Sequence, residues 1–201
     1  MANVNQPKGF VPSRYQNANP YTGAANIYCI PSSDGSQYGV GDAVKTVAGG
    51  DANGLPYVTK AAGTDTVRGV IVGVLPPGLN NPSLVGVNLD LTVQNVPATK
   101  AKAYYVMVAD DPDILFEFMD DGLSALTSTS CNKNASFTVA NPTSPAQNSA
   151  SVLSTASIGT VNTLNLKLVG LVQKPNNVFG VNALWLVKWN LHEFNSPTVA
   201  Y

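Results

Sequence analysis

Charged residues are scarce in this sequence. Asp, Glu, Lys and Arg make up 11% of its 201 residues, against about 25% in a typical soluble domain. Glu and Arg occur only twice each. Because Glu, Lys and Arg usually cover exposed helix faces, their scarcity argues against long surface helices. The net charge of −1 also provides no basic surface for nucleic acid, so we expect no direct nucleic-acid partner.

Long apolar runs and clustered cysteines are also lacking, and there is only one histidine. No run reaches the roughly 18 apolar residues of a membrane span, and the N-terminus has no signal-peptide core. We therefore expect synthesis in a host cytoplasm and no membrane partner. Cys29 and Cys131 are isolated, which favours buried thiols over a disulfide in that compartment. The only histidine, His192, falls on the polar face of an expected strand, where a hydrogen-bonded surface or partly buried side chain is the simplest interpretation.

Turn-forming and strand-forming residues are abundant instead. The chain has 21 Asn, 17 Gly and 14 Pro, which favour turns, with Val and Thr between them, which favour strands. Alternating or apolar segments predict strands at 26–30, 38–47, 55–61, 69–75, 103–109, 114–119, 163–172 and 183–192, and weaker ones at 84–96 and 137–139. The sequence predicts an all-β fold, an antiparallel β-barrel or sandwich with long loops and little helix.

The last expected strand gives the clearest core prediction. Its alternation places Trp185, Val187, Trp189 and Leu191 on one apolar face, which we expect to be buried. The segment 114–119 also alternates, although a short helix is the alternative there.

Composition divides the chain into two parts. Residues 1–25 are rich in Pro, Gly and Asn without periodicity, which predicts an extended N-terminal arm. Its apolar anchors are Phe10, Val11, Tyr15 and Tyr21, and we expect them to contact this domain or a neighbouring subunit. Residues 26–201 are expected to form a single β-rich domain with a Ser/Thr/Asn-rich loop at 123–160. Deletion of residues 2–24 is then expected to leave a folded protein.

An acidic segment is the main candidate for chemistry. Six of the twelve carboxylates fall within twelve residues: Asp110, Asp111, Asp113, Glu117, Asp120 and Asp121. The spacing lacks the EF-hand pattern, and nothing fixes a glycosidase-like separation. Acid-capped turns at both ends of a strand are the simplest interpretation; a cation site and a docking patch for a basic partner are alternatives. We predict no cofactor, no metal site and no catalytic residue.

Several short motifs occur in an order that resembles small head proteins of tailed bacteriophages. They are the opening residues 1–14, Gly41-Asp-Ala-Val44, Tyr57-Val-Thr-Lys-Ala61, Gly69-Val-Ile-Val-Gly73, Val108-Ala-Asp-Asp-Pro112 with Phe116-Glu117, Asn177-Val-Phe-Gly180 and Val187-Lys-Trp-Asn-Leu-His192. The resemblance covers most of the chain except residues 123–160.

The resemblance implies a capsid decoration, or cement, protein on the outer surface of the virion. Its partners would be the major capsid protein and further copies of itself, with a trimer favoured slightly over a dimer. The residues expected to make these contacts are Phe10, Val11, Tyr15, Tyr21, Asp110, Asp111, Asp113 and Glu117. The alternatives are another virion component, such as a minor head, tail or receptor-binding protein, and a carboxylate-based hydrolase.

Overall fold

The computed structural model describes residues 3–75, 95–142 and 148–195. The fold is all-β, as the composition predicted. The helical segments within these ranges are two short 3₁₀ helices, η2 (Ser128–Ser130) and η3 (Thr155–Ser157). No helix within these ranges is long and apolar enough to cross a membrane. Most of the weak strand expected at 84–96 lies outside the described residues.

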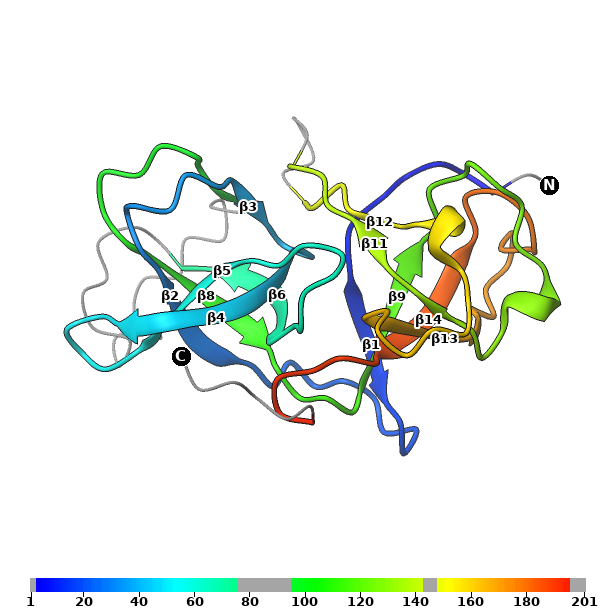
Figure 1. Cartoon of the computed structure of the whole chain (residues 1–201), viewed down its shortest axis with the longest axis horizontal. Coiled ribbons are helices and arrows are strands. Elements are labelled where there is room, and N and C mark those ends of the chain that lie inside the picture. Colours follow the sequence, from blue (N-terminus) through cyan, green and yellow to red (C-terminus); the bar gives the residue numbers. More distant parts are fainter. Residues whose placement is uncertain (1–2, 76–94, 143–147, 196–201) are drawn as a thin grey trace.

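Five strands close into a barrel, on the left in Figure 1: β2 (Asn26–Ile30), β4 (Ala43–Gly50), β5 (Pro56–Lys60), β6 (Gly69–Val74) and β8 (Tyr104–Ala109). Their order is β2-β5-β4-β6-β8. Every pair is antiparallel except β2–β5, which closes the barrel through Cys29 opposite Tyr57. Closure leaves no free strand edge in the barrel.

Alternating side chains from these strands fill the barrel. Val44, Val58, Ile71 and Val106 are fully buried in one cluster. A two-stranded pair, β3 (Tyr38–Gly39) with β7 (Asn95–Val96), adds Tyr38 and Val96 to the same cluster. Valine and isoleucine suit this interior because their branched side chains fit a pleated, buried surface.

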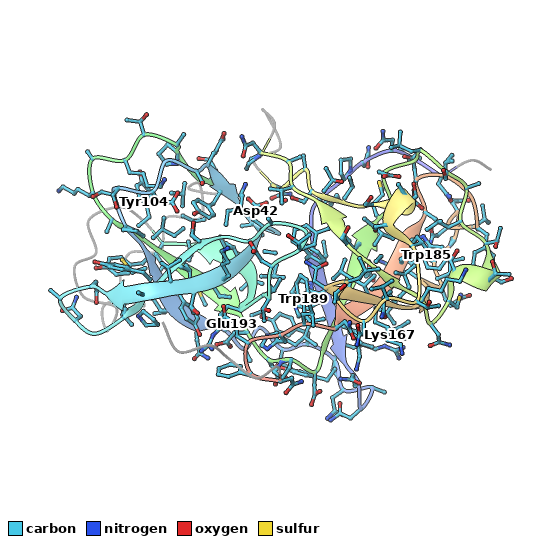
Figure 2. The ribbon with its side chains drawn as sticks, viewed as in Figure 1. Asp42, Tyr104, Lys167, Trp185, Trp189 and Glu193 are labelled. Atoms are coloured by element: carbon cyan, nitrogen blue, oxygen red, sulfur yellow. The ribbon has the colours of Figure 1, made fainter. Side chains whose placement is uncertain are left out.

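The second half of the molecule is a sheet lobe. Its five strands run in the order β1 (Val11–Tyr15), β9 (Ile114–Met119), β14 (Leu184–Trp189), β13 (Leu166–Leu171) and β10 (Asn134–Ala135), and the pair β11 (Phe137–Thr138) with β12 (Val152–Leu153) lies beside them. Trp185, Val187 and Trp189 are buried as predicted; Figure 2 shows Trp185 within this lobe and Trp189 toward the side that faces the barrel. Leu191 lies beyond the end of β14 and is only half-buried.

The N-terminal residues are part of this lobe. Strand β1 pairs with β9, with Val11 opposite Glu117. Phe10 is 1% exposed, and its ring stacks on Phe118 with centroids 3.7 Å apart. The expectation that Phe10 contacts a shell or subunit is therefore corrected: its side chain is part of the core.

One hydrophobic cluster, the shared core, contains residues of both lobes. Ala43, Ala61 and Val67 from the barrel side belong to the same buried cluster as Phe10 and Phe137. Gly63 lies so close to the sheet lobe that an added Cβ would stand 2.1 Å from the carbonyl oxygen of Phe137. The barrel strands, residues 26–109, come between β1 and β9 in the sequence, so the barrel is an insertion in the sheet lobe.

Candidate binding surfaces and the lobe junction

The acidic segment does not converge on one site. At the start of β9, the Asp113 amide donates to Asp111 Oδ1 at 2.8 Å. At its end, the Leu123 amide donates to Asp121 Oδ1 at 3.1 Å. Glu117 lies between them and pairs with Lys174. The carboxylates therefore cap the turns at both ends of β9, which was the simplest interpretation of the sequence. Among the described residues, no group of three or more metal-ligating side chains is arranged to hold an ion.

Asp120 is buried and fixes two loops. Its carboxylate accepts from the amides of Gly122, Asn182 and Ala183 at 2.7 to 3.0 Å and from Trp185 Nε1 at 3.2 Å. Burial raises its pKa against the opposing effect of these donors. Since every donor belongs to a loop or strand end beside Asp120, this carboxylate serves the structure of the sheet lobe.

Asp110 is also buried, at the junction of the lobes. It accepts from Asn26 Nδ2 at 3.0 Å and from the Tyr28 hydroxyl at 2.6 Å. Arg68 Nε donates to the same hydroxyl at 2.7 Å. Burial, followed by the bond to Asp110, raises the pKa of Tyr28. Asp110 is therefore a structural residue in this chain rather than an exposed contact.

A C-terminal strap, residues 191–195, runs from the sheet lobe onto the barrel (Figure 1). The Glu193 carboxylate accepts from the amide and hydroxyl of Thr46, both at 2.8 Å. The Arg68 guanidinium stacks over the Phe194 ring at 3.7 Å. The two lobes are thus held together by hydrogen bonds and a cation–π contact as well as by the shared core.

His192 in this strap is 1% exposed, which corrects the expected surface or partly buried position. It is buried because the strap packs on the barrel on both sides of it. The Val67 amide donates to the Leu191 carbonyl, and the Val67 carbonyl accepts from the Glu193 amide. Its Nδ1 accepts from the Phe194 amide at 3.1 Å. Burial lowers the pKa of His192 to about 4, so the imidazole is neutral at pH 7.

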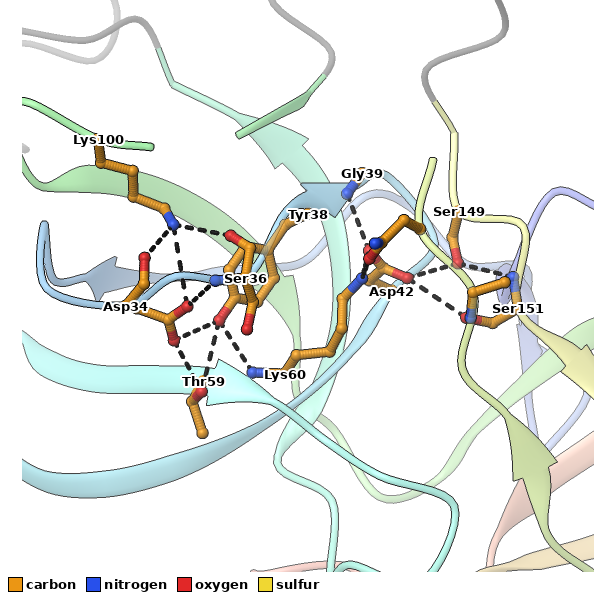
Figure 3. Close-up of polar contacts among 12 residues, drawn as sticks. Asp34, Ser36, Tyr38, Gly39, Asp42, Thr59, Lys60, Lys100, Ser149 and Ser151 are labelled. Carbon is orange, nitrogen blue, oxygen red and sulfur yellow. Dashed lines mark hydrogen bonds and ion pairs between the residues drawn. The ribbon is translucent and has the colours of Figure 1, made fainter. Parts of the chain in front are cut away.

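A buried ion pair of the barrel also contacts the sheet lobe through Ser149 (Figure 3). Asp42 Oδ2 lies 2.9 Å from Lys60 Nζ and accepts from the Gly39 amide at 2.9 Å. Its other oxygen, Oδ1, accepts from the Ser149 hydroxyl of the sheet lobe at 2.5 Å. The motif residue Asp42 is thus satisfied on both oxygens, and it fixes the lobes relative to each other.

A second polar network lies within the barrel (Figure 3). The Lys100 ammonium donates to the carbonyls of Asp34 and Ser36 at 2.5 and 2.7 Å, and its side chain is 0% exposed. Burial alone would raise the pKa of Asp34, but bonds from Tyr38, Ser36 and Thr59 hold it below its usual value. This network anchors the loop before β3 to the barrel.

The outer face of the sheet lobe carries a groove. It is lined by residues of the N-terminal segment, of β1, β9 and β14, and of the loop before β14, among them Asn3, Val4, Val11, Glu117, Lys174 and Leu184. Val11 is 40% exposed and lies opposite Glu117 in the β1–β9 register. Of the predicted contact residues, these two share this surface.

The remaining predicted residues meet elsewhere. Tyr15, Asp111 and Asp113 line a second hollow together with Gln16, Asn17, Asn19, Pro20 and Thr22. Gln16 Nε2 donates to Asp113 Oδ1 at 2.7 Å, and the Tyr15 and Tyr21 rings lie 6.2 Å apart. Tyr21 packs against the shared core and is only partly buried.

Sequence reasoning predicted a turn at residues 174–180 but not its contact with Asn3. Asn177 bonds to Val172 and Leu184 through its side chain, and Asn3 bonds to Val178 and Val181. Asparagines that bond to backbone in turns are a known signal, but nothing local links Asn3 to a loop 175 residues later.

Cys29 is buried and Cys131 is partly buried, and both thiols are free. Burial raises the pKa of Cys29 to about 11, which makes it a poor nucleophile at pH 7.

Fold and contacts thus define an all-β protein in which a closed barrel is inserted into a sheet lobe. No protein-family model, curated protein or solved structure matches this chain.

Proposed function

We propose that this protein is a virion structural protein that binds the outer surface of a tailed-phage head and cements neighbouring major capsid subunits. Support comes from the order of its motifs, which resembles phage head proteins. The observation that carries the proposal is the outer groove, where Val11 and Glu117 lie side by side on neighbouring strands of the sheet. This role is one of binding, and it requires no catalytic step.

The groove has the character of a protein contact. It combines an exposed valine with the Glu117–Lys174 ion pair, in which Lys174 is 51% exposed. Apolar area provides affinity, and peripheral charges select the partner and its orientation. Each binding site needs only modest affinity, because a head has many equivalent sites and the bound copies stabilise it together.

The shared core suits a cementing role. Phe10 belongs to the sheet lobe, yet its amide donates to Gly41 on the barrel side at 2.9 Å. Because the lobes are held by backbone, ionic and apolar contacts together, binding orders few additional groups. A protein that binds only the assembled shell stabilises that shell by mass action.

Heads that lack this protein provide the test. Purified wild-type protein should bind them saturably at a fixed copy number, and the coated heads should withstand a higher temperature before releasing DNA. Val11→Asp places a carboxylate beside Glu117 and should weaken binding at least about tenfold. Val169→Asp is the matched control, because Val169 is also exposed, at 37%, but lies on β13 away from the groove.

The outcomes separate the claims. Wild-type protein that does not bind heads contradicts the proposed function. Binding that Val11→Asp leaves unchanged contradicts the groove alone. A copy number of a few per virion, located at the tail, would indicate another virion component instead.

A further inference from the structure

A lysine amine, a carboxamide and a buried carboxylate meet where the barrel faces the sheet lobe. Lys60 Nζ lies 3.3 Å from Asn141 Oδ1 and 2.9 Å from Asp42 Oδ2, and Figure 3 shows the Lys60 side chain running toward Asp42. Lys60 ends β5 of the barrel, whereas Asn141 follows β11 of the sheet lobe, 81 residues later. A nucleophile, an acyl group and a base that activates the nucleophile are the components of acyl transfer.

The surroundings of these three groups suit such a transfer. The side chains of Asp42 and Lys60 are 1% and 10% exposed. Passing a proton from the Lys60 ammonium to the Asp42 carboxylate leaves two uncharged groups, which a site with little water favours over two charges. Asn141 is exposed, so ammonia released from its carboxamide can leave directly into solvent.

Hydrogen bonds hold the reacting groups in place before any reaction. The Ser151 hydroxyl donates to Asp42 Oδ1 at 3.4 Å and accepts from the Ala140 amide at 3.2 Å. The segment that carries Asn141 is therefore tied to the carboxylate that contacts Lys60. Groups fixed in contact react as if at very high concentration, because the entropy of bringing them together is already lost on folding.

The residue after Asn141 protects its carboxamide from the usual competing reaction. An asparagine side chain commonly loses ammonia when the backbone nitrogen of the next residue attacks it. Pro142 follows Asn141, is buried, and has no N–H to take part in that attack. The Asn141 carboxamide is thus preserved for a nucleophile from elsewhere in the fold.

We propose that Lys60 and Asn141 become joined by an isopeptide bond after the chain folds. Asp42 takes a proton from Lys60 Nζ, and the neutral amine attacks Asn141 Cγ. Asp42 then passes that proton to Nδ2 of the tetrahedral intermediate and takes a second proton from Nζ as the Cγ–Nδ2 bond breaks. The second proton goes to the departing ammonia. Overall, an ammonium and a carboxamide give one secondary amide and one ammonium ion, and Asp42 returns to the carboxylate.

The bond would connect the lobes covalently. It closes the chain between β5 and the segment after β11, which restricts the unfolded chain in the way that a disulfide does. The reaction needs no oxidant, cofactor or partner, and it does not depend on the proposed function.

Intact-mass spectrometry of the full chain tests this proposal. Wild-type protein, measured when freshly purified and again after long incubation in the folded state, should end about 17 Da lighter than its sequence, the mass of one ammonia. Because trypsin does not cleave after an acylated lysine, a digest should contain a branched peptide that joins Lys60 to Asn141. Protein kept in concentrated urea should retain its full mass.

Three variants test the roles of the individual groups. Asn141→Ala changes an exposed residue, should fold normally and should show no mass loss. Lys60→Arg keeps a cation beside Asp42 but should form no cross-link. Asp42→Asn, where circular dichroism shows it folded, should slow the mass loss at least about a hundredfold.

A second lysine provides a comparison within the same molecule. Lys188 Nζ lies 3.2 Å from Gln16 Oε1 in an exposed position, and no carboxylate among the described residues forms an ion pair with Lys188. We expect no cross-link there. Folded wild-type protein that keeps its full mass overturns the proposal, as does a mass loss that persists in Asn141→Ala. Neither result bears on head binding, and failure to bind heads would leave the cross-link standing.

Discussion

The Ser149 hydroxyl donates to Asp42 Oδ1 at 2.5 Å, across a sequence separation of 107 residues. Asp42 is 1% exposed and Ser149 is 0% exposed. One short bond thus joins the barrel to the sheet lobe at a point that water does not reach. The stability of the lobe junction should therefore depend on the ion pair that completes the environment of Asp42.

Lys60→Met should destabilise the protein by about 3 kcal/mol, because it leaves the buried Asp42 carboxylate without its cation. Urea unfolding measures the change. Lys45→Met is the matched control: the Lys45–Asp65 pair is 31% and 24% exposed, so its loss should cost no more than about 1 kcal/mol. Equal effects for the two variants would contradict a structural role for the buried pair.

Phe10→Ala should cost about 3 to 5 kcal/mol, since it leaves a cavity between Phe118 and Trp189, whose ring lies 4.7 Å from that of Phe10. Val11→Ala, next to it but 40% exposed, should cost under about 1 kcal/mol. Thermal unfolding compares the two.

Deletion of residues 2–24 follows the same reasoning. It removes Phe10 and β1 together, so we now expect an unfolded or strongly destabilised chain, contrary to the expectation from sequence. A truncated protein with wild-type thermal stability would show that β1 is dispensable.

Stability should fall between about pH 7 and pH 5 through His192. Its pKa is about 4 in the folded protein and 6.5 as the ordinary value, so the unfolded chain binds more protons in this window. Stability is complete above pH 6.5 and decreases as the pH falls toward 4, by about 2 kcal/mol at pH 5.

His192→Asn tests the source of this dependence. An asparagine oxygen can accept the Phe194 amide in place of Nδ1, and it does not titrate in this range. The difference between the urea unfolding midpoints at about pH 7 and pH 5 should be smaller in the variant than in the wild type. An unchanged difference would assign the pH dependence to other groups.

Gly63→Ala should lower the free energy of unfolding by several times the roughly 0.5 kcal/mol of an ordinary surface substitution. Its Cβ would lie 2.1 Å from the Phe137 carbonyl oxygen, so the lobes would have to separate. Gly35→Ala, where nothing lies within 4 Å, should change stability by under about 0.5 kcal/mol. Calorimetry of both variants measures the contrast. A tolerated Gly63→Ala would mean that the junction is looser than the contacts indicate.

Local patterns predicted most strands but not how they assemble. The alternation of Ile114 to Met119 marked β9, and the apolar face of Trp185, Val187 and Trp189 marked a core, because side-chain periodicity is encoded residue by residue. Barrel closure through Cys29 and Tyr57 depends on a parallel pairing between strands distant in sequence. No local pattern specifies that pairing.

The candidate contact residues were predicted less well, for a related reason. A run of carboxylates predicts exposure, yet Asp110 and Asp120 are buried and accept hydrogen bonds from residues distant in sequence, such as Tyr28 and Ala183. Phe10 was read as an anchor for a partner, and its partner is Phe118 of the same chain. Burial of polar and terminal residues is a tertiary property.

Strands β1 and β14 flank β9, and both run antiparallel to it, so they run parallel to each other. Tension between the two ends of the described chain would first release the strap at Glu193 and Thr46. It would then pull the two strands in opposite directions along β9, loading many hydrogen bonds in shear at once rather than unzipping them singly. The inserted barrel lies between these strands in the sequence, so it would carry no load until the sheet yields.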